Sequence, residues 1–226
     1  MNELNALVRE SLAVFDKDLR SEFRTKYSLN AILLFAVTTL TVVSFAVGQF
    51  GLTPEIQSAL YWTIIFFSAM SGLARVFVRE EEAGTVHALR LAASPTVVYL
   101  GKLAFNVVLM GILEIVVFPL FVVMMGLRVD NYVLFFAVLV LGSAGLASLA
   151  TIMAAIVAKA NVKGALFTIL SFPPLLPLLI TCIRGTRLAL EGAETAAAGP
   201  ELRLLVAYAV VMVTASLMLF DFVWGD

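Results

Sequence analysis

Residues 132–158 of this 226-residue chain read YVLFFAVLVLGSAGLASLATIMAAIVA and contain no Asp, Glu, Lys, Arg or His. An α-helix rises about 1.5 Å per residue, so this stretch would make a helix about 40 Å long. The hydrocarbon core of a bilayer is about 30 Å thick, and about 20 consecutive apolar residues cross it. The stretch by itself therefore predicts a transmembrane helix.

Five further stretches are similarly poor in charge: four contain no charged residue, and one contains only Glu114. They cover residues 29–48, 57–74, 103–127, 164–183 and 204–220. The apolar runs are continuous and do not alternate with a period of two residues, which favours helices over barrel strands. We therefore expect an all-α polytopic membrane protein, with six transmembrane helices in a single domain over residues 1–226.

The composition excludes several classes of protein. The chain is 62% hydrophobic and 14% charged, whereas soluble domains are about 25% charged. The single cysteine excludes an intramolecular disulfide and a cysteine metal cluster. His87 is the only histidine and falls in a charged loop, so we expect a surface or docking residue and no bound cofactor or metal.

Lysine and arginine residues gather on one side of the expected membrane. Of the 15 in the chain, the segment before the first span and the loops after the second and fourth spans hold all but four. These four are Arg128, Arg184, Arg187 and Arg203. Because positively charged loops remain in the cytoplasm, we expect both termini and the loop over residues 75–102 to be cytoplasmic.

Residues 3–27 have the pattern of an amphipathic helix. Apolar residues recur at spacings of three or four, at Leu4, Val8, Leu12, Phe15, Leu19 and Phe23. Most charged residues of the segment fall on other faces. We expect this helix to lie in the membrane interface with its apolar stripe among the acyl chains. A helix packed on a partner protein is the alternative.

The loop over residues 75–102 carries a dense block of charge and ends at the turn signal Ser94-Pro95. Its candidate docking residues are Arg79, Glu80, Glu81, Glu82, Gly84, Thr85, His87 and Arg90. We expect the acidic run to begin a short helix, where the backbone dipole favours negative charge. Such a helix could dock on a soluble partner through charge complementarity. The alternative is a solvated loop whose charges only set the topology.

Polar residues within the spans are the other candidates. Glu114 is the one charge deep in a span, and Asn106 precedes it by eight residues, near the same helix face. An ionisable group there is costly unless it is paired, protonated or facing water. We expect a hydrogen bond across helices or to a partner subunit, and a place in a translocation path is the alternative.

Two other segments have a distinct composition. The fourth span is rich in Gly, Ala and Ser over residues 142–148, which predicts close helix packing or an oligomer contact. Residues 184–203 mix charge with apolar residues, and we expect short amphipathic or re-entrant helical pieces on the outer face.

The chain lacks the motifs of an enzyme. The phosphate-binding pattern GxxxxGK[ST] is absent, because Leu103 follows Gly101-Lys102 and Thr96 stands in place of the first glycine. If the chain takes part in driven transport, the energy must come from another polypeptide.

Four segments together resemble the CcmB family, the haem exporter protein B family of ABC-2-type permeases in cytochrome c maturation. They are DLRSEFR (18–24), FVREEEAGTV (77–86), Ser94-Pro95 with Gly101-Lys102, and FPPLLP (172–177). The resemblance covers nearly the whole chain. It implies a multi-pass subunit of the bacterial inner membrane, with ABC-2-type permease architecture.

The resemblance also implies partners. A cytoplasmic subunit, CcmA, would bind and hydrolyse ATP, and the membrane proteins CcmC and CcmD would complete the complex. ATP hydrolysis would release the haem-loaded chaperone CcmE, so that the complex handles haem. Two copies of the permease, surrounded by lipid, are expected, and no nucleic acid.

Two other functions remain open from the residues alone. One is an ABC-2 exporter of a lipid, drug or glycan, with a substrate cavity between two permease copies. The other is a membrane scaffold without energy coupling, for which the charged loop needs no ATPase partner.

Overall fold

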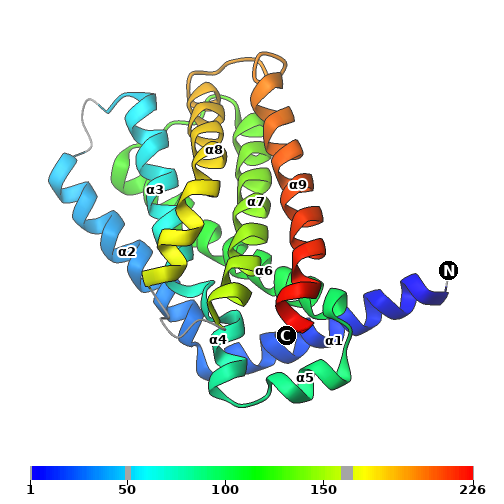
Figure 1. Cartoon of the computed structure of the whole chain (residues 1–226). Coiled ribbons are helices and arrows are strands. Elements are labelled where there is room, and N and C mark those ends of the chain that lie inside the picture. The colour runs from blue at the N-terminus through cyan, green and yellow to red at the C-terminus, as the bar shows by residue number, and fades with distance from the viewer. Residues whose placement is uncertain (1, 49–51, 159–164, 226) are drawn as a thin grey trace.

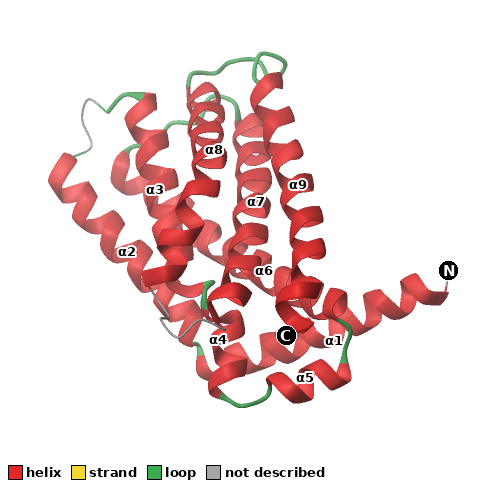
Figure 2. Ribbon diagram, in the orientation of Figure 1, coloured by secondary structure: helices red, strands yellow, loops and turns green. Residues whose placement is uncertain are grey.

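The computed structural model describes residues 2–48, 52–158 and 165–225, with side chains over 3–48, 52–158 and 171–224. Every regular element in these ranges is a helix (Figures 1 and 2). The helices are α1 (Asn2–Thr25), α2 (Tyr27–Val47), α3 (Pro54–Gly72), α4 (Arg75–Glu82), α5 (Val86–Ala92), α6 (Pro95–Met125), α7 (Tyr132–Ala158), α8 (Ala165–Leu190) and α9 (Gly199–Gly225). The all-α fold predicted from the sequence is confirmed.

Five helical segments are long and apolar enough to cross a membrane, among the residues that the structure describes. They are Tyr27–Val47, Pro54–Glu82, Pro95–Met125, Tyr132–Ala158 and Gly199–Trp224. The chain is therefore a multi-pass membrane protein. The remaining expected span, 164–183, corresponds to α8 and begins outside the described residues.

Helix α7 lies at the centre of the bundle and packs against α4, α6, α8 and α9. A Cβ atom added at Gly142 would lie 2.5 Å from the Trp62 ring and 2.6 Å from the sulfur of Cys182. The same Trp62 donates a hydrogen bond to Thr186 of α8 over 2.8 Å. Small residues in α7 thus allow its neighbours to approach closely, as the composition of the expected fourth span predicts.

Helix α6 begins earlier than the charge pattern predicts. It starts at Pro95, whereas the apolar run starts at Leu103. Proline suits the first turn of a helix because the N–H that it lacks has no partner there. The expected loop over residues 75–102 therefore contains α4, α5 and the first two turns of α6.

The segment over residues 184–203 also differs from the expected re-entrant pieces. Helix α8 continues to Leu190, and α9 already begins at Gly199. Ala189 and Leu190 are both buried, and the carbonyl of Ala189 accepts a hydrogen bond from the N–H of Asn131 over 3.0 Å. The end of α8 is therefore packed within the protein, and only a short connection leads from it to α9.

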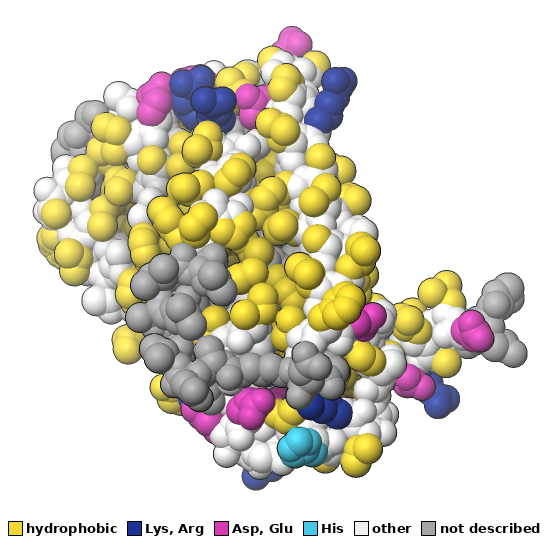
Figure 3. Space-filling view, viewed as in Figure 1, with side chains coloured by type: hydrophobic (Ala, Val, Ile, Leu, Met, Phe, Trp, Pro, Cys, Tyr) yellow, Lys and Arg dark blue, Asp and Glu magenta, His cyan; other side chains and the backbone are white. Residues whose placement is uncertain are grey.

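The bundle has two charged ends with an apolar surface between them (Figure 3). Helices α1, α4 and α5 lie at one end, and both chain termini lie at that end as well (Figure 1). Between the ends, α2 and α9 expose large apolar side chains, among them Phe45 and Val210. An exposed apolar surface of this kind is expected where a protein faces lipid.

Candidate functional site

Helix α4 ends at Glu82, and a tight turn at Gly84 leads into α5. The N–H of Gly84 donates to the carbonyl of Glu81 over 3.1 Å, and that of Thr85 donates to the carbonyl of Glu80 over 3.0 Å. Gly84 has φ +65°, a left-handed conformation that glycine adopts without steric cost at helix ends. The acidic run therefore ends helix α4, and the prediction that it begins a helix is wrong.

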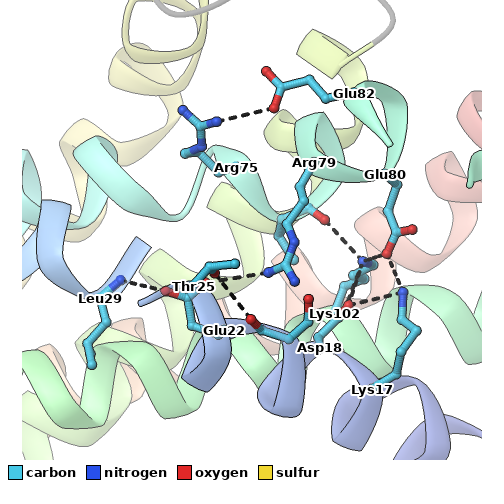
Figure 4. A network of polar contacts seen from close by, with 12 residues as sticks. Lys17, Asp18, Glu22, Thr25, Leu29, Arg75, Arg79, Glu80, Glu82 and Lys102 are labelled. Carbon is cyan, nitrogen blue, oxygen red and sulfur yellow. Dashed lines mark hydrogen bonds and ion pairs between the residues drawn. The ribbon is translucent and has the colours of Figure 1, made fainter. Parts of the chain in front are cut away.

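Glu80 points into the protein and lies among cations. The buried Lys102 of α6 donates to its carboxylate over 2.7 Å and to Asp18 of α1 over 3.1 Å. Lys17 also donates to Glu80, and the Thr85 hydroxyl does so over 2.5 Å. Figure 4 shows Lys102 between the two carboxylates. We call Lys17, Asp18, Glu80 and Lys102 the charged junction, because they join α1, α4 and α6.

The charges of the junction balance. Glu80 belongs to the charged helix α4, beyond the apolar part of its span. Burial alone would raise its pKa, but the charge and hydrogen bond of Lys102, with hydrogen bonds from Lys17 and Thr85, lower the pKa to about 2. Glu80 is therefore ionised at neutral pH, and two lysines face two carboxylates. Removing one partner of such a buried pair would leave an uncompensated charge.

A third acidic residue, Glu22, connects three helices beside the junction. Its carboxylate accepts the N–H of Leu29, in the first turn of α2, over 2.9 Å. The other oxygen lies 3.5 Å from the guanidinium of Arg79 in α4. Between α1 and α2 the chain turns at Lys26, whose φ is 53°. Glu22 thus holds the end of α1 against both α2 and α4.

Close packing fixes α1 on α6 next to the charged pairs. A Cβ atom added at Gly101 would lie 2.7 Å from Cβ of Val14 and 2.9 Å from the carbonyl oxygen of Ser11. Val14, Asp18 and Glu22 are all buried and follow one another at four-residue spacing on one helix face. The packed face of α1 therefore combines apolar packing with two paired carboxylates.

The remaining docking candidates divide into exposed and packed residues. Glu81, Glu82 and His87 are exposed, although Glu82 also forms an ion pair with Arg75 at 3.2 Å. The guanidinium of Arg90 lies 5.3 Å from the ring centre of Trp224 in α9. The surface that a partner could reach is therefore formed by the α4–α5 turn, while Glu80 and Arg90 attach that turn to the rest of the protein.

The two polar residues within the third expected span face α7. The amide of Asn106 donates to the hydroxyl of Thr151 over 2.9 Å, and Glu114 accepts a hydrogen bond from Ser143. Both candidates therefore form hydrogen bonds across helices. They do not contact the charged junction.

Three members of the junction, Lys17, Asp18 and Lys102, are absent from the predicted site residues. Asp18 and Lys102 illustrate the reason. They lie 84 residues apart in the sequence, so no local pattern indicates their pairing. One feature of the sequence does indicate the position of Lys102. It is a lone cation about two turns into a helix that begins at Pro95. Recognising Pro95 as the helix start would have placed this charge inside the bundle.

Comparison with known proteins identifies relatives of this sequence. The sequence model of the family described as "CcmB protein" matches residues 9–223. Heme exporter protein B of Rhodobacter capsulatus is 30% identical over 185 residues, which is 80% of this chain and 83% of that protein. The family match begins within α1 and covers the charged junction and nearly all of the five apolar helical segments. The chain belongs to the CcmB family.

Proposed function

We propose that this chain is the permease subunit of an ABC-type complex that delivers haem during the biogenesis of c-type cytochromes. Membership in the CcmB family and the printed name of the Rhodobacter relative support the assignment. The chain would transmit an ATP-driven change from a cytoplasmic ATPase subunit, and the complex would then release a haem-loaded chaperone or export haem. ATP would bind to the partner and not to this chain.

The proposed topology has six spans with both termini in the cytoplasm of a bacterium, in its inner membrane. Helix α8 would be the sixth span. The position of both termini at the end that carries α4 and α5 supports this arrangement (Figure 1). The excess of lysine and arginine at the same end supports a cytoplasmic location for it.

Helix α1 would lie in the membrane interface. Leu4, Val8, Leu12 and Phe23 are exposed, whereas Val14, Asp18 and Glu22 of the same helix are buried against the bundle. Exposed apolar side chains on a helix that also packs on the bundle suit a helix that rests among lipid headgroups.

The observation that carries the proposed function is the attachment of the exposed α4–α5 turn to two other helices. A partner that binds Glu81 and Glu82 would move α4, and Glu80 would transmit the movement to Lys102 in α6 and Asp18 in α1. Coupling of this kind requires two arrangements of the helices that the nucleotide states of the partner favour differently. The ATPase CcmA would be that partner, with CcmC, CcmD and a second permease copy in the membrane and CcmE as the chaperone.

Charge reversal at the exposed turn tests the proposal. We expect the double substitution Glu81→Lys and Glu82→Lys to abolish copurification of the ATPase subunit, because both side chains are exposed and Glu80 remains in place. The matched control reverses Glu191 and Glu194, which are exposed at the opposite end of the bundle, and should retain the ATPase. Retention in the first variant, or loss in the control, would contradict the proposal and favour a scaffold without energy coupling.

A further inference from the structure

A groove on the membrane face between α6 and α7 has an unusual combination of apolar walls and hydrogen-bond acceptors. Its volume is about 420 Å³, and Gly111, Ile115, Phe118 and Phe136 line it together with Glu114. Ile115 is 75% exposed and Phe136 46%, so the groove opens at the surface of the bundle. The charged junction and the α4–α5 turn take no part in it.

Glu114 lies near the middle of the bilayer. It is 11 residues from the end of α6 at Met125, which corresponds to about 16 Å along the helix axis. It is also about 28 Å from the helix start at Pro95. Because the hydrocarbon core is about 30 Å thick, lipid headgroups do not reach this depth.

The polar atoms of the groove can accept further hydrogen bonds. Ser143 donates its hydroxyl hydrogen to Glu114, and a carboxyl group keeps an acceptor oxygen in either protonation state. Pro119 has no N–H, so the carbonyl of Ile115, four residues earlier, lacks its usual helical donor. Unpaired acceptors in hydrocarbon are costly, and an acyl chain supplies no donor.

We propose that the groove binds a transmembrane helix of a different membrane subunit, which inserts a side chain with an N–H or O–H donor next to Glu114. The inference rests on the proposed function in one respect, because it requires that the chain belongs to a membrane complex. The volume of the groove is sufficient for one large side chain. Donor groups are the chemistry that interhelical contacts use at this depth.

A second copy of this chain fits the groove poorly. Symmetric dimers bring the same surface patch of each subunit together. Such a dimer would place Glu114 opposite the Glu114 of the other copy. Apart from Glu114, the side chains that line the groove are apolar, so two ionised Glu114 side chains would face each other with no donor between them.

Photo-crosslinking from the edge of the groove tests the inference. The substitution Ile115→p-benzoylphenylalanine is made in the intact complex in native membranes, and the adduct is mapped by mass spectrometry. We expect an adduct with a transmembrane segment of another polypeptide that carries a donor side chain at the mapped position. A photo-crosslinker at Val42, which is exposed on α2, serves as the control and should not give this adduct.

Two kinds of variant show whether the polar group and the groove itself are required. Glu114→Leu should lower the adduct yield roughly three- to thirtyfold, the range expected for one interhelical hydrogen bond, and Glu114→Gln should retain most of it. Gly111→Leu should block the groove without disturbing the fold, because a Cβ atom there meets nothing within 4 Å. Val42→Leu is its matched control and should leave the yield unchanged.

The outcomes separate this inference from the proposed function. Retention of the ATPase subunit is measured in the same preparations. If the ATPase is retained but the adduct contains only lipid or a second copy of the chain, the groove inference fails and the proposed function stands. An adduct whose yield does not respond to Glu114→Leu or Gly111→Leu also overturns the inference.

Discussion

At the residue scale, one buried lysine organises the end of the bundle that we propose to face the cytoplasm. The side chain of Lys102 is only 1% exposed. Its amino group contacts Asp18 at 2.9 Å and Glu80 at 2.7 Å. It also donates to the carbonyl of Val76 over 3.0 Å. Burial of an ammonium group is tolerable only with such partners. Three helices therefore depend on one side chain for their electrostatic balance.

Replacing this lysine should destabilise the protein strongly. Lys102→Met keeps the aliphatic part of the side chain but leaves Asp18 and Glu80 without their buried cation, so we expect a loss of roughly 3–5 kcal/mol in unfolding free energy. Denaturant titration in detergent micelles measures the loss. The control is Arg20→Met, which breaks the exposed Arg20–Asp16 pair and should cost less than about 1 kcal/mol. Equal losses in the two variants would contradict a buried junction.

Two glycines should respond in opposite directions to alanine. Gly84 has a positive φ, so Gly84→Ala should destabilise the chain by roughly 1–2 kcal/mol through backbone strain. Gly111 lies within helix α6 with open space at its Cβ position, so Gly111→Ala should stabilise it by roughly 0.5–1 kcal/mol. The same titrations compare both variants with the natural chain. No loss of stability in Gly84→Ala would contradict the left-handed turn at Gly84, and a loss in Gly111→Ala would contradict the open space at Gly111.

At the element scale, the apolar runs of the sequence predict the long helices well. The run over 132–158 coincides with α7, because an uninterrupted apolar segment in lipid must satisfy its own backbone hydrogen bonds. The apolar run does not predict the early start of α6, because the charge of Lys102 in the first turns of the helix interrupts that run. The sequence pattern also does not predict that Glu80 points inward, because its lysine partners lie in other helices. Patterns within one helix do not reveal charges paired across helices.

The contact between α1 and α6 yields a prediction at this scale. Gly101→Ala would place a methyl group against Val14 and the backbone of Ser11, so we expect α1 to detach partly from α6. Hydrogen–deuterium exchange should then rise in α1 and remain unchanged in the central helix α7. Gly199→Ala, which meets nothing within 4 Å, is the control and should leave exchange in α1 unchanged. Unchanged exchange in α1 of the Gly101→Ala variant would contradict the close packing.

At the scale of the whole molecule, charged groups at one end are connected to apolar helices that extend to the other. The α4–α5 turn is exposed, whereas the residues directly behind it are buried and paired with α1 and α6 (Figure 4). Helix α4 also packs against the central helix α7. A force on the turn therefore reaches the bundle through charged pairs and through direct packing. The account predicts that the charged pairs can be removed without removing the binding surface.

The most direct measurement compares ATP hydrolysis with the proposed release of a haem-loaded chaperone in the purified complex. The double variant Glu80→Gln, Lys102→Met removes the ion pair but leaves Glu81 and Glu82 exposed. We expect the ATPase subunit to stay bound and to hydrolyse ATP, while release per ATP falls by roughly 5- to 150-fold, the usual range of coupling between sites. The control variant Asp16→Asn, Arg20→Met should release the chaperone normally. Undiminished release from the Glu80–Lys102 variant would contradict transmission through the charged junction.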